Sequence, residues 1–292
     1  MPRWFLWTLL AVLSWGVWAV TSRLIGDALS APHLQALSTL GLLPVMAALA
    51  LSRKSSVAAH RLRGSLWAAA AGVLTCLGNA AYYDLLNRGA KAATVVPLTA
   101  LYPLVTVALA VPLLKERLNR IQVTGIVLSL AAMYLFNVQG GQSLAASAIA
   151  WTFAPIALWG VAALLQKIST NHISGESATL WFLAAFVPVA AVILWREPLP
   201  AGVAPKTWLL AAALGLFFAL GNFALLAAFA GGGKASVIAP IAGLYPLVSV
   251  PIAILFLGER IGSRETAGIV LALVSVAALS FETRANASTS QT

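Results

Sequence analysis

Ten long apolar stretches, separated by short polar loops, constrain this chain more than any other feature of its sequence. Their approximate bounds are 4–23, 34–51, 65–86, 92–114, 121–137, 145–166, 177–195, 207–230, 235–257 and 266–281. An α-helix needs about 20 apolar residues to cross the hydrocarbon core of a bilayer, and it pairs its own backbone amides there. A β-barrel would instead show alternating segments of about 10 residues, which the sequence lacks. We therefore predict an all-α integral membrane protein with ten transmembrane helices.

The charge content agrees with a bilayer as the solvent. Only 9% of the 292 residues are charged and 61% are hydrophobic, whereas a soluble domain carries about 25% charged residues. The net charge of +10 comes from Lys and Arg in the loops rather than from one basic stripe, so we expect no nucleic-acid partner. If the N-terminus is cytoplasmic, 11 of the 18 Lys and Arg residues lie in inside segments and 7 in outside segments. This bias predicts a multi-pass protein of the cell inner (cytoplasmic) membrane with both termini cytoplasmic.

An internal duplication is the most specific pattern in the chain. At an offset of 143 residues, 91–128 aligns with 234–271 with 17 identities in 38 positions, and Leu101-Tyr102-Pro103 aligns with Leu244-Tyr245-Pro246. At an offset of 144 residues, Trp15-Gly16-Val17 aligns with Trp159-Gly160-Val161. Apolar composition alone does not place tyrosine, proline and tryptophan in one order at one offset.

The duplication predicts two five-helix repeats, at 1–138 and 145–282, followed by a disordered cytoplasmic tail at 283–292. Five is an odd number of spans, so the second repeat enters the membrane from the opposite side. Two inverted repeats of this kind are a transporter architecture, in which the binding site lies near the midplane between the halves.

The duplicated motifs also resemble a known family. The Ser14-Trp15-Gly16 and Leu158-Trp159-Gly160 motifs, the proline-rich stretches that follow, and the Glu-Arg pairs after them resemble the drug/metabolite transporter superfamily, specifically its EamA-type transporters. The resemblance covers about 4–281 and implies export or exchange of small metabolites such as amino acids through a central cavity. Relatives in the small multidrug resistance group carry a glutamate in the first helix, where this chain has tryptophan.

Paired polar residues within the spans are candidates for substrate binding, because polar groups in a bilayer are costly. Asn79 and Asn222 lie 143 residues apart, and an amide offers both donors and an acceptor. Tyr102 and Tyr245 lie in mid-span, each followed by proline. The alternative is structural: amides that bond between helices, and phenols that bond to neighbouring backbone.

Three tryptophans lie deep within spans, namely Trp15, Trp18 and Trp159. They would form an aromatic wall for an apolar or cationic substrate. Packing against lipid or other helices is the alternative for each of them.

Lysines and prolines of the fourth and ninth stretches are candidates for gating or for helix kinks. Lys91 and Lys234 begin these stretches, where a cation opposes the helix dipole. They could bind a substrate carboxylate, act as gates, or extend to the lipid headgroups. The prolines, which remove backbone donors and bend helices, are Pro97, Pro103, Pro240 and Pro246.

The eight acids and three histidines all lie in loops or near span ends. Proton-coupled transporters usually keep a titratable group at mid-membrane. We therefore expect a secondary transporter, working by alternating access as an exporter, facilitator or exchanger of a neutral or zwitterionic metabolite. A flippase for a lipid-linked group is an alternative, and a non-transport membrane subunit or enzyme is another.

The sequence also indicates which other activities and partners to expect. The sequence has no zinc-binding His pair, no nucleophile elbow and no complete phosphate loop, so we expect no enzymatic activity, no metal and no cofactor. The expected partners are a small-molecule metabolite and the lipid bilayer, and the chain would be a monomer or a homodimer.

Overall fold

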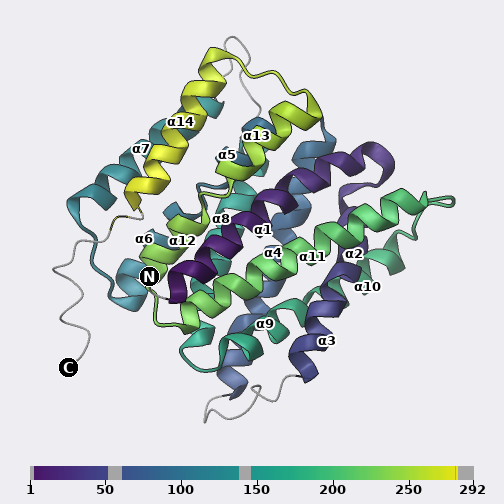
Figure 1. The fold of residues 1–292 in the computed structure, drawn as a ribbon, viewed down its shortest axis with the longest axis horizontal. Helices are drawn as coiled ribbons and strands as arrows, with labels where there is room; N and C mark the ends of the chain where they lie inside the picture. Colours follow the sequence, from purple (N-terminus) through teal and green to yellow (C-terminus); the bar gives the residue numbers. More distant parts are fainter. Residues whose placement is uncertain (1–2, 52–60, 138–145, 280, 282–292) are drawn as a thin grey trace.

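The protein is a bundle of helices (Figure 1). The computed structural model describes residues 3–51, 61–137, 146–279 and 281, and within these ranges it contains no strand. The helices of the first half are α1 (Arg3–Ile25), η1 (Gly26–Ala28), α2 (Ala31–Ser38), η2 (Thr39–Leu42), α3 (Leu43–Leu51), α4 (Arg61–Asn87), α5 (Ala92–Thr99), α6 (Pro103–Leu114) and α7 (Arg120–Asn137). Those of the second half are α8 (Ala146–Thr170), α9 (Gly175–Ala184), α10 (Phe186–Arg196), α11 (Pro205–Ala230), α12 (Ala235–Ala242), α13 (Pro246–Leu257) and α14 (Ser263–Leu279).

Eight segments of the described chain are long and apolar enough to cross a membrane. They are Arg3–Ile25, Ala31–Leu51, Arg61–Asn87, Ala92–Leu114, Phe153–Thr170, Gly175–Arg196, Pro205–Ala230 and Ala235–Leu257. The remaining two apolar helices, α7 and α14, have shorter apolar lengths, Arg120–Ala132 and Thr266–Leu279. The prediction of a multi-pass, all-helical membrane protein is confirmed, whereas the number of ten spans stays a prediction.

Four of the predicted spans are interrupted, which the apolar pattern alone did not indicate. The segment from Ala92 to Leu114 ends its first helix at Thr99 and begins its second at Pro103, and the segment from Ala235 to Leu257 breaks in the same way before Pro246. Proline has no N–H and its ring clashes with the carbonyl four residues earlier, so it suits the first turn of a helix and disturbs the hydrogen bonding of one when it lies farther along. Pro44 and Pro188 lie in the first turns of α3 and α10, after the two other breaks.

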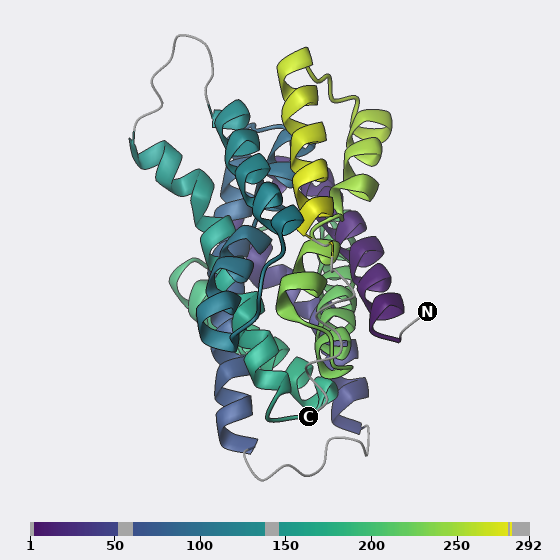
Figure 2. The same ribbon diagram turned by 90° about the vertical axis from the view of Figure 1, so that its left-hand side faces the viewer.

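The longest helices pack in pairs that join the two halves of the sequence. In the bundle α1 lies along α11, α4 along α8, and α7 along α14. Figure 2 shows the last of these pairs side by side as well. Glycines permit close approach in the core: a Cβ at Gly72 would collide with the Phe182 carbonyl, and one at Gly215 with the Ser38 carbonyl.

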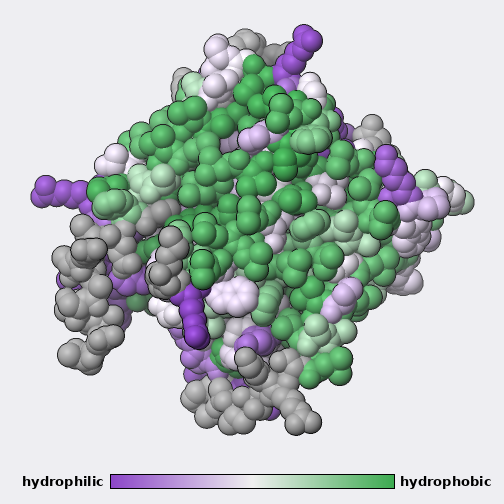
Figure 3. All heavy atoms as spheres, viewed as in Figure 1, coloured by the Kyte–Doolittle hydropathy of each residue, from purple (hydrophilic) through white to green (hydrophobic). Residues whose placement is uncertain are grey.

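The outer surface of the bundle is apolar. Large aliphatic side chains such as Leu13, Leu209 and Leu255 are exposed, and apolar residues cover most of the face seen in Figure 3. Such a surface suits lipid rather than water. The predicted linker between the halves and the predicted tail at 283–292 lie outside the described residues.

Candidate functional site

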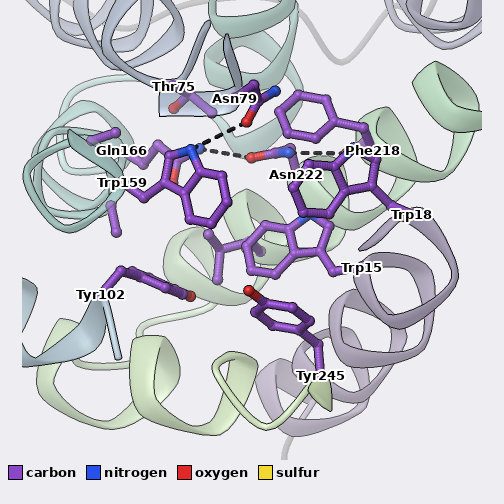
Figure 4. Close-up of a pocket in the computed structure, with 13 residues that line it drawn as sticks. Trp15, Trp18, Thr75, Asn79, Tyr102, Trp159, Gln166, Phe218, Asn222 and Tyr245 are labelled. Carbon is purple, nitrogen blue, oxygen red and sulfur yellow. Dashed lines mark hydrogen bonds between the residues drawn. The ribbon is translucent and has the colours of Figure 1, made fainter. Parts of the chain in front are cut away.

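A pocket lies among the buried helices, and it is lined from both halves of the sequence. Its walls come from α1, α4, α8 and α11 and from the breaks before α6 and α13 (Figure 4). All seven residues predicted from the sequence to bind substrate line it, namely Trp15, Trp18, Asn79, Tyr102, Trp159, Asn222 and Tyr245. Its cavity volume is about 40 Å³, far below the several hundred Å³ typical of pockets that hold a small molecule. A metabolite can therefore enter only if the lining moves apart.

Aromatic rings form much of the pocket wall. The Trp15 ring centroid lies 6.5 Å from that of Tyr102 and 6.3 Å from that of Tyr245, and both tyrosine rings are nearly perpendicular to the indole. Trp18 stacks on Tyr82 with centroids 5.2 Å apart and lies 5.7 Å from Trp159. Edge-to-face and stacked contacts of this kind hold large side chains in fixed orientations.

The two asparagines bind different partners within the pocket. Trp159 donates from Nε1 to Asn79 Oδ1 at 3.1 Å. Asn222 Oδ1 instead accepts from Gln166 Nε2 at 3.1 Å, while its own Nδ2 donates to the Phe218 carbonyl at 2.9 Å. Asn79 is thus held by a residue of α8, and Asn222 by a residue of α8 and by its own helix, α11.

The two tyrosine hydroxyls link the halves reciprocally. Tyr102 donates to the Ala239 carbonyl at 3.3 Å, and Tyr245 donates to the Val96 carbonyl at 3.4 Å. Both the donors and the acceptors lie 143 positions apart in the sequence. The interrupted helices of the two halves therefore meet at the base of the pocket.

The predicted gating and kink residues lie on these interrupted helices. Pro97 and Pro240 lie within α5 and α12, and Pro103 and Pro246 begin α6 and α13. The Pro240 ring frees the carbonyl of residue 236 from the helix, and this carbonyl accepts a bond from Gln122 Nε2 at 3.4 Å. It is thus held by a side chain of α7.

Lys91 and Lys234 are the N-caps of α5 and α12, and neither caps the helix with its side chain. Carboxylates from the other half of the sequence bind these helix starts instead. Glu259 accepts from the amides of residues 92 and 93 at 2.9 and 2.7 Å. Glu116 accepts from the amides of residues 235 and 236 at 3.1 and 2.9 Å.

The pocket lining is polar at a few points but uncharged. Among the described residues, no acidic or basic side chain lines it. An ion with an unpaired net charge would lose its hydration there without an opposite charge to replace it. The groups that line the pocket are amides, indoles, hydroxyls and aromatic surface.

Sequence reasoning missed six lining residues: Thr75, Ala162, Ala163, Gln166, Phe218 and Leu225. Gln166 is the most polar of them and is buried. The sequence feature that could have indicated Gln166 is a polar side chain inside an apolar stretch. The residue 144 positions earlier is Ser22, however, so the duplication shows no matching pair at this position. Thr75 precedes Asn79 by four residues, one helical turn along the same face.

Comparisons with known proteins agree with this architecture. The model of the EamA-like transporter family matches residues 2–138 and again residues 146–281. An uncharacterized protein of Methanocaldococcus jannaschii is 41% identical over 66 residues, which is 23% of this chain and about half, 47%, of that relative. A protein of known crystal structure matches with a TM-score of 0.69 at 20% identity over 94% of each chain, a likeness that establishes the fold alone.

The fold and the pocket define a multi-pass helical membrane protein with a buried, uncharged pocket between its halves. The chain belongs to the EamA-like transporter family.

Proposed function

We propose that the protein is a secondary transporter that moves a small organic metabolite, such as an amino acid, across the cytoplasmic membrane by alternating access. It would act as an exporter, facilitator or exchanger. One observation carries the proposal: the pocket is lined from both halves of the sequence, and Tyr102 and Tyr245 each donate to a backbone carbonyl of the opposite half. Rocking of one half against the other would open such a pocket to each side in turn.

We further propose that 1–138 and 145–282 are inverted five-helix repeats, with α7 and α14 as the fifth span of each. Two observations support this organisation. The family model matches each half separately, and the bonds of Glu116 and Glu259 to the opposite half recur at the same offset of 143. The organisation gives ten spans and so leaves both termini on one side of the membrane, and the excess of Lys and Arg in the inside segments favours the cytoplasmic side.

The proposed substrate is neutral or zwitterionic. The uncharged lining supports this class, because a zwitterion or a neutral solute brings no unpaired net charge into the pocket. We propose that the seven predicted lining residues contact it. The aromatic walls would bind its apolar part, and the polar groups of the lining would bind its polar part.

Gating is proposed to act at the starts of α5 and α12. Lys91 and Lys234 flank the amides that bind Glu259 and Glu116. Figure 1 places α5 beside α13 and α6 beside α12, toward different ends of the bundle. Opening one end of the pocket would separate one of these contacts while the other stays closed, and the proline breaks would bend as it does.

Counterflow in sealed liposomes tests the proposal. Vesicles with the purified protein, preloaded with unlabelled L-leucine, L-phenylalanine or uridine, should accumulate the labelled form of at least one of them without a proton gradient. The solute should be recovered chemically unchanged, and protein-free vesicles are the control. Counterflow that a protonophore abolishes, or conversion of the solute, would contradict the proposed mechanism.

A further inference from the structure

Two tryptophans that begin the same sequence motif have different hydrogen bonding. Trp159 donates from Nε1 to Asn79 Oδ1 at 3.1 Å. Trp15 lies 144 positions earlier, and the duplication pairs it with Asn222. Yet within the described part of the chain Trp15 Nε1 has no hydrogen-bond partner, although the side chain is only 9% exposed.

Gln166 accounts for the difference. Its Nε2 donates to Asn222 Oδ1 at 3.1 Å, so it takes one lone pair of the acceptor that would correspond to Asn79 Oδ1, and Trp15 does not use the other. In the first half the corresponding residue is Ser22, which is too short to do the same and donates to the Ala19 carbonyl at 3.1 Å. Asn222 Nδ2 also donates to the Phe218 carbonyl, which fixes the orientation of the amide.

The unpartnered indole N–H belongs to the pocket. Trp15 lines it, and its ring packs edge-on against both pocket tyrosines. Figure 4 shows the Trp15 indole in the middle of the lining, between the tyrosines and Asn222. The hydroxyls of both tyrosines already donate to backbone carbonyls. An indole N–H is a donor only, and leaving it unpaired when buried costs free energy.

We propose, building on the transport function above, that Trp15 Nε1 donates to a carbonyl or carboxylate oxygen of the transported solute. Gln166 is then a positioning residue, which keeps this donor available by occupying Asn222. A neutral or zwitterionic solute with such an oxygen satisfies the buried N–H, whereas an isostere without it leaves the N–H unpaired. A site with a buried donor discriminates strongly against ligands that lack the matching acceptor.

Matched substitutions of the two tryptophans test the assignment. Binding of L-leucine, L-phenylalanine and uridine to the full-length purified protein is measured by calorimetry for the wild type, W15F and W159F. W15F should weaken the binding of any of these solutes that the wild type binds by about tenfold or more, as expected for a lost buried hydrogen bond. W159F should weaken it less but lower the melting temperature more, because it leaves Asn79 Oδ1 without its donor. Equal binding losses in the two variants, or none in W15F, would overturn the proposal.

The role of Gln166 has a readout that needs no ligand. In ¹⁵N-labelled protein the Trp15 indole resonance is identified by its absence in W15F. Q166L keeps the side-chain volume but releases Asn222 Oδ1, so the Trp15 N–H should donate to that oxygen and its resonance should shift downfield. The variant should also bind solute about tenfold more weakly, because the indole N–H is no longer available. An indole resonance that is the same in Q166L and the wild type would overturn the role of Gln166.

The two measurements also separate the inference from the function on which it rests. If the wild type binds none of the three solutes, the proposed substrate class is wrong. The indole resonance alone then tests whether Trp15 Nε1 is an available donor. A wild-type chemical shift typical of a hydrogen-bonded indole would overturn this claim, and a downfield change in Q166L relative to the wild type would support it.

Discussion

Asn79 and Asn222 carry the same side chain at positions 143 apart, and both are 2% exposed. Asn79 accepts from an indole, while Asn222 accepts from a glutamine and donates to the backbone of its own helix. A small change in a neighbouring residue, serine at one position and glutamine at the other, therefore gives the two halves of the pocket different hydrogen-bonding surfaces.

Replacing both asparagines by alanine should weaken solute binding by about tenfold or more while the protein stays folded. The variant removes two of the few polar groups in an apolar lining, and each is worth about 1 kcal/mol or more when it binds a ligand. Binding is measured by calorimetry and folding by thermal unfolding in detergent.

A matched control removes a buried bond elsewhere. Ser129 and Ser275 bond to each other at 3.2 Å between α7 and α14, away from the pocket. S129A/S275A should therefore leave solute binding unchanged. A folded Asn79→Ala, Asn222→Ala variant with unchanged binding would show that the asparagines are structural only.

At the scale of elements, the starts of α5 and α12 are each bound by a side chain from the opposite half of the sequence. The first turn of a helix has amides without intrahelical partners, and a Ser, Thr, Asp or Asn at the N-cap normally binds one of them. In α5 and α12 the N-cap is a lysine, whose charge opposes the helix dipole. Glu259 and Glu116 bind these amides from the opposite half, and their negative charge offsets that disadvantage.

Glu259→Ala should lower the free energy of unfolding by about 1–2 kcal/mol. The substitution removes two charge-assisted hydrogen bonds from the start of α5. A hydrogen bond to a charged group is worth about 1.5–3 kcal/mol when it is buried, and it is worth less here because the carboxylate is half-buried. Glu259→Gln keeps an acceptor and should cost less. Unfolding in detergent measures both.

Glu116→Ala is the matched variant at the start of α12 and should show a similar loss. Glu197 is exposed, so Glu197→Ala should change the free energy of unfolding by no more than about 0.5 kcal/mol. If Glu259→Ala unfolded at the same temperature as the wild type, the carboxylate would not hold the two halves together.

At the scale of the whole molecule, the apolar pattern was enough to predict a multi-pass helical membrane protein, since each span is a local property of the chain. The duplication led to six of the seven lining residues, because tyrosine, tryptophan and asparagine recur in order, whereas Trp18 was predicted from its depth within a span. The sequence did not predict the partners of Glu116 and Glu259 or the contribution of Gln166. These depend on which helices become neighbours in space, and Gln166 has no polar counterpart of similar length in the other half.

The proposed inverted arrangement of the two halves leads to the last prediction. Arg117 and Arg260 follow Glu116 and Glu259, lie 143 positions apart and are both exposed. With five spans per half, they must lie on opposite sides of the membrane. The single cysteine, Cys76, is buried, so a Cys76→Ala background allows one new thiol at a time to be labelled in intact cells.

In that background Arg260→Cys should react with a membrane-impermeant thiol reagent, and Arg117→Cys should react only after the cells are permeabilised. The reverse pattern would keep the inverted repeat but place both termini outside. Labelling of both thiols from one side would require an even number of spans between them, and the pocket could not then lie between two oppositely oriented copies of one unit.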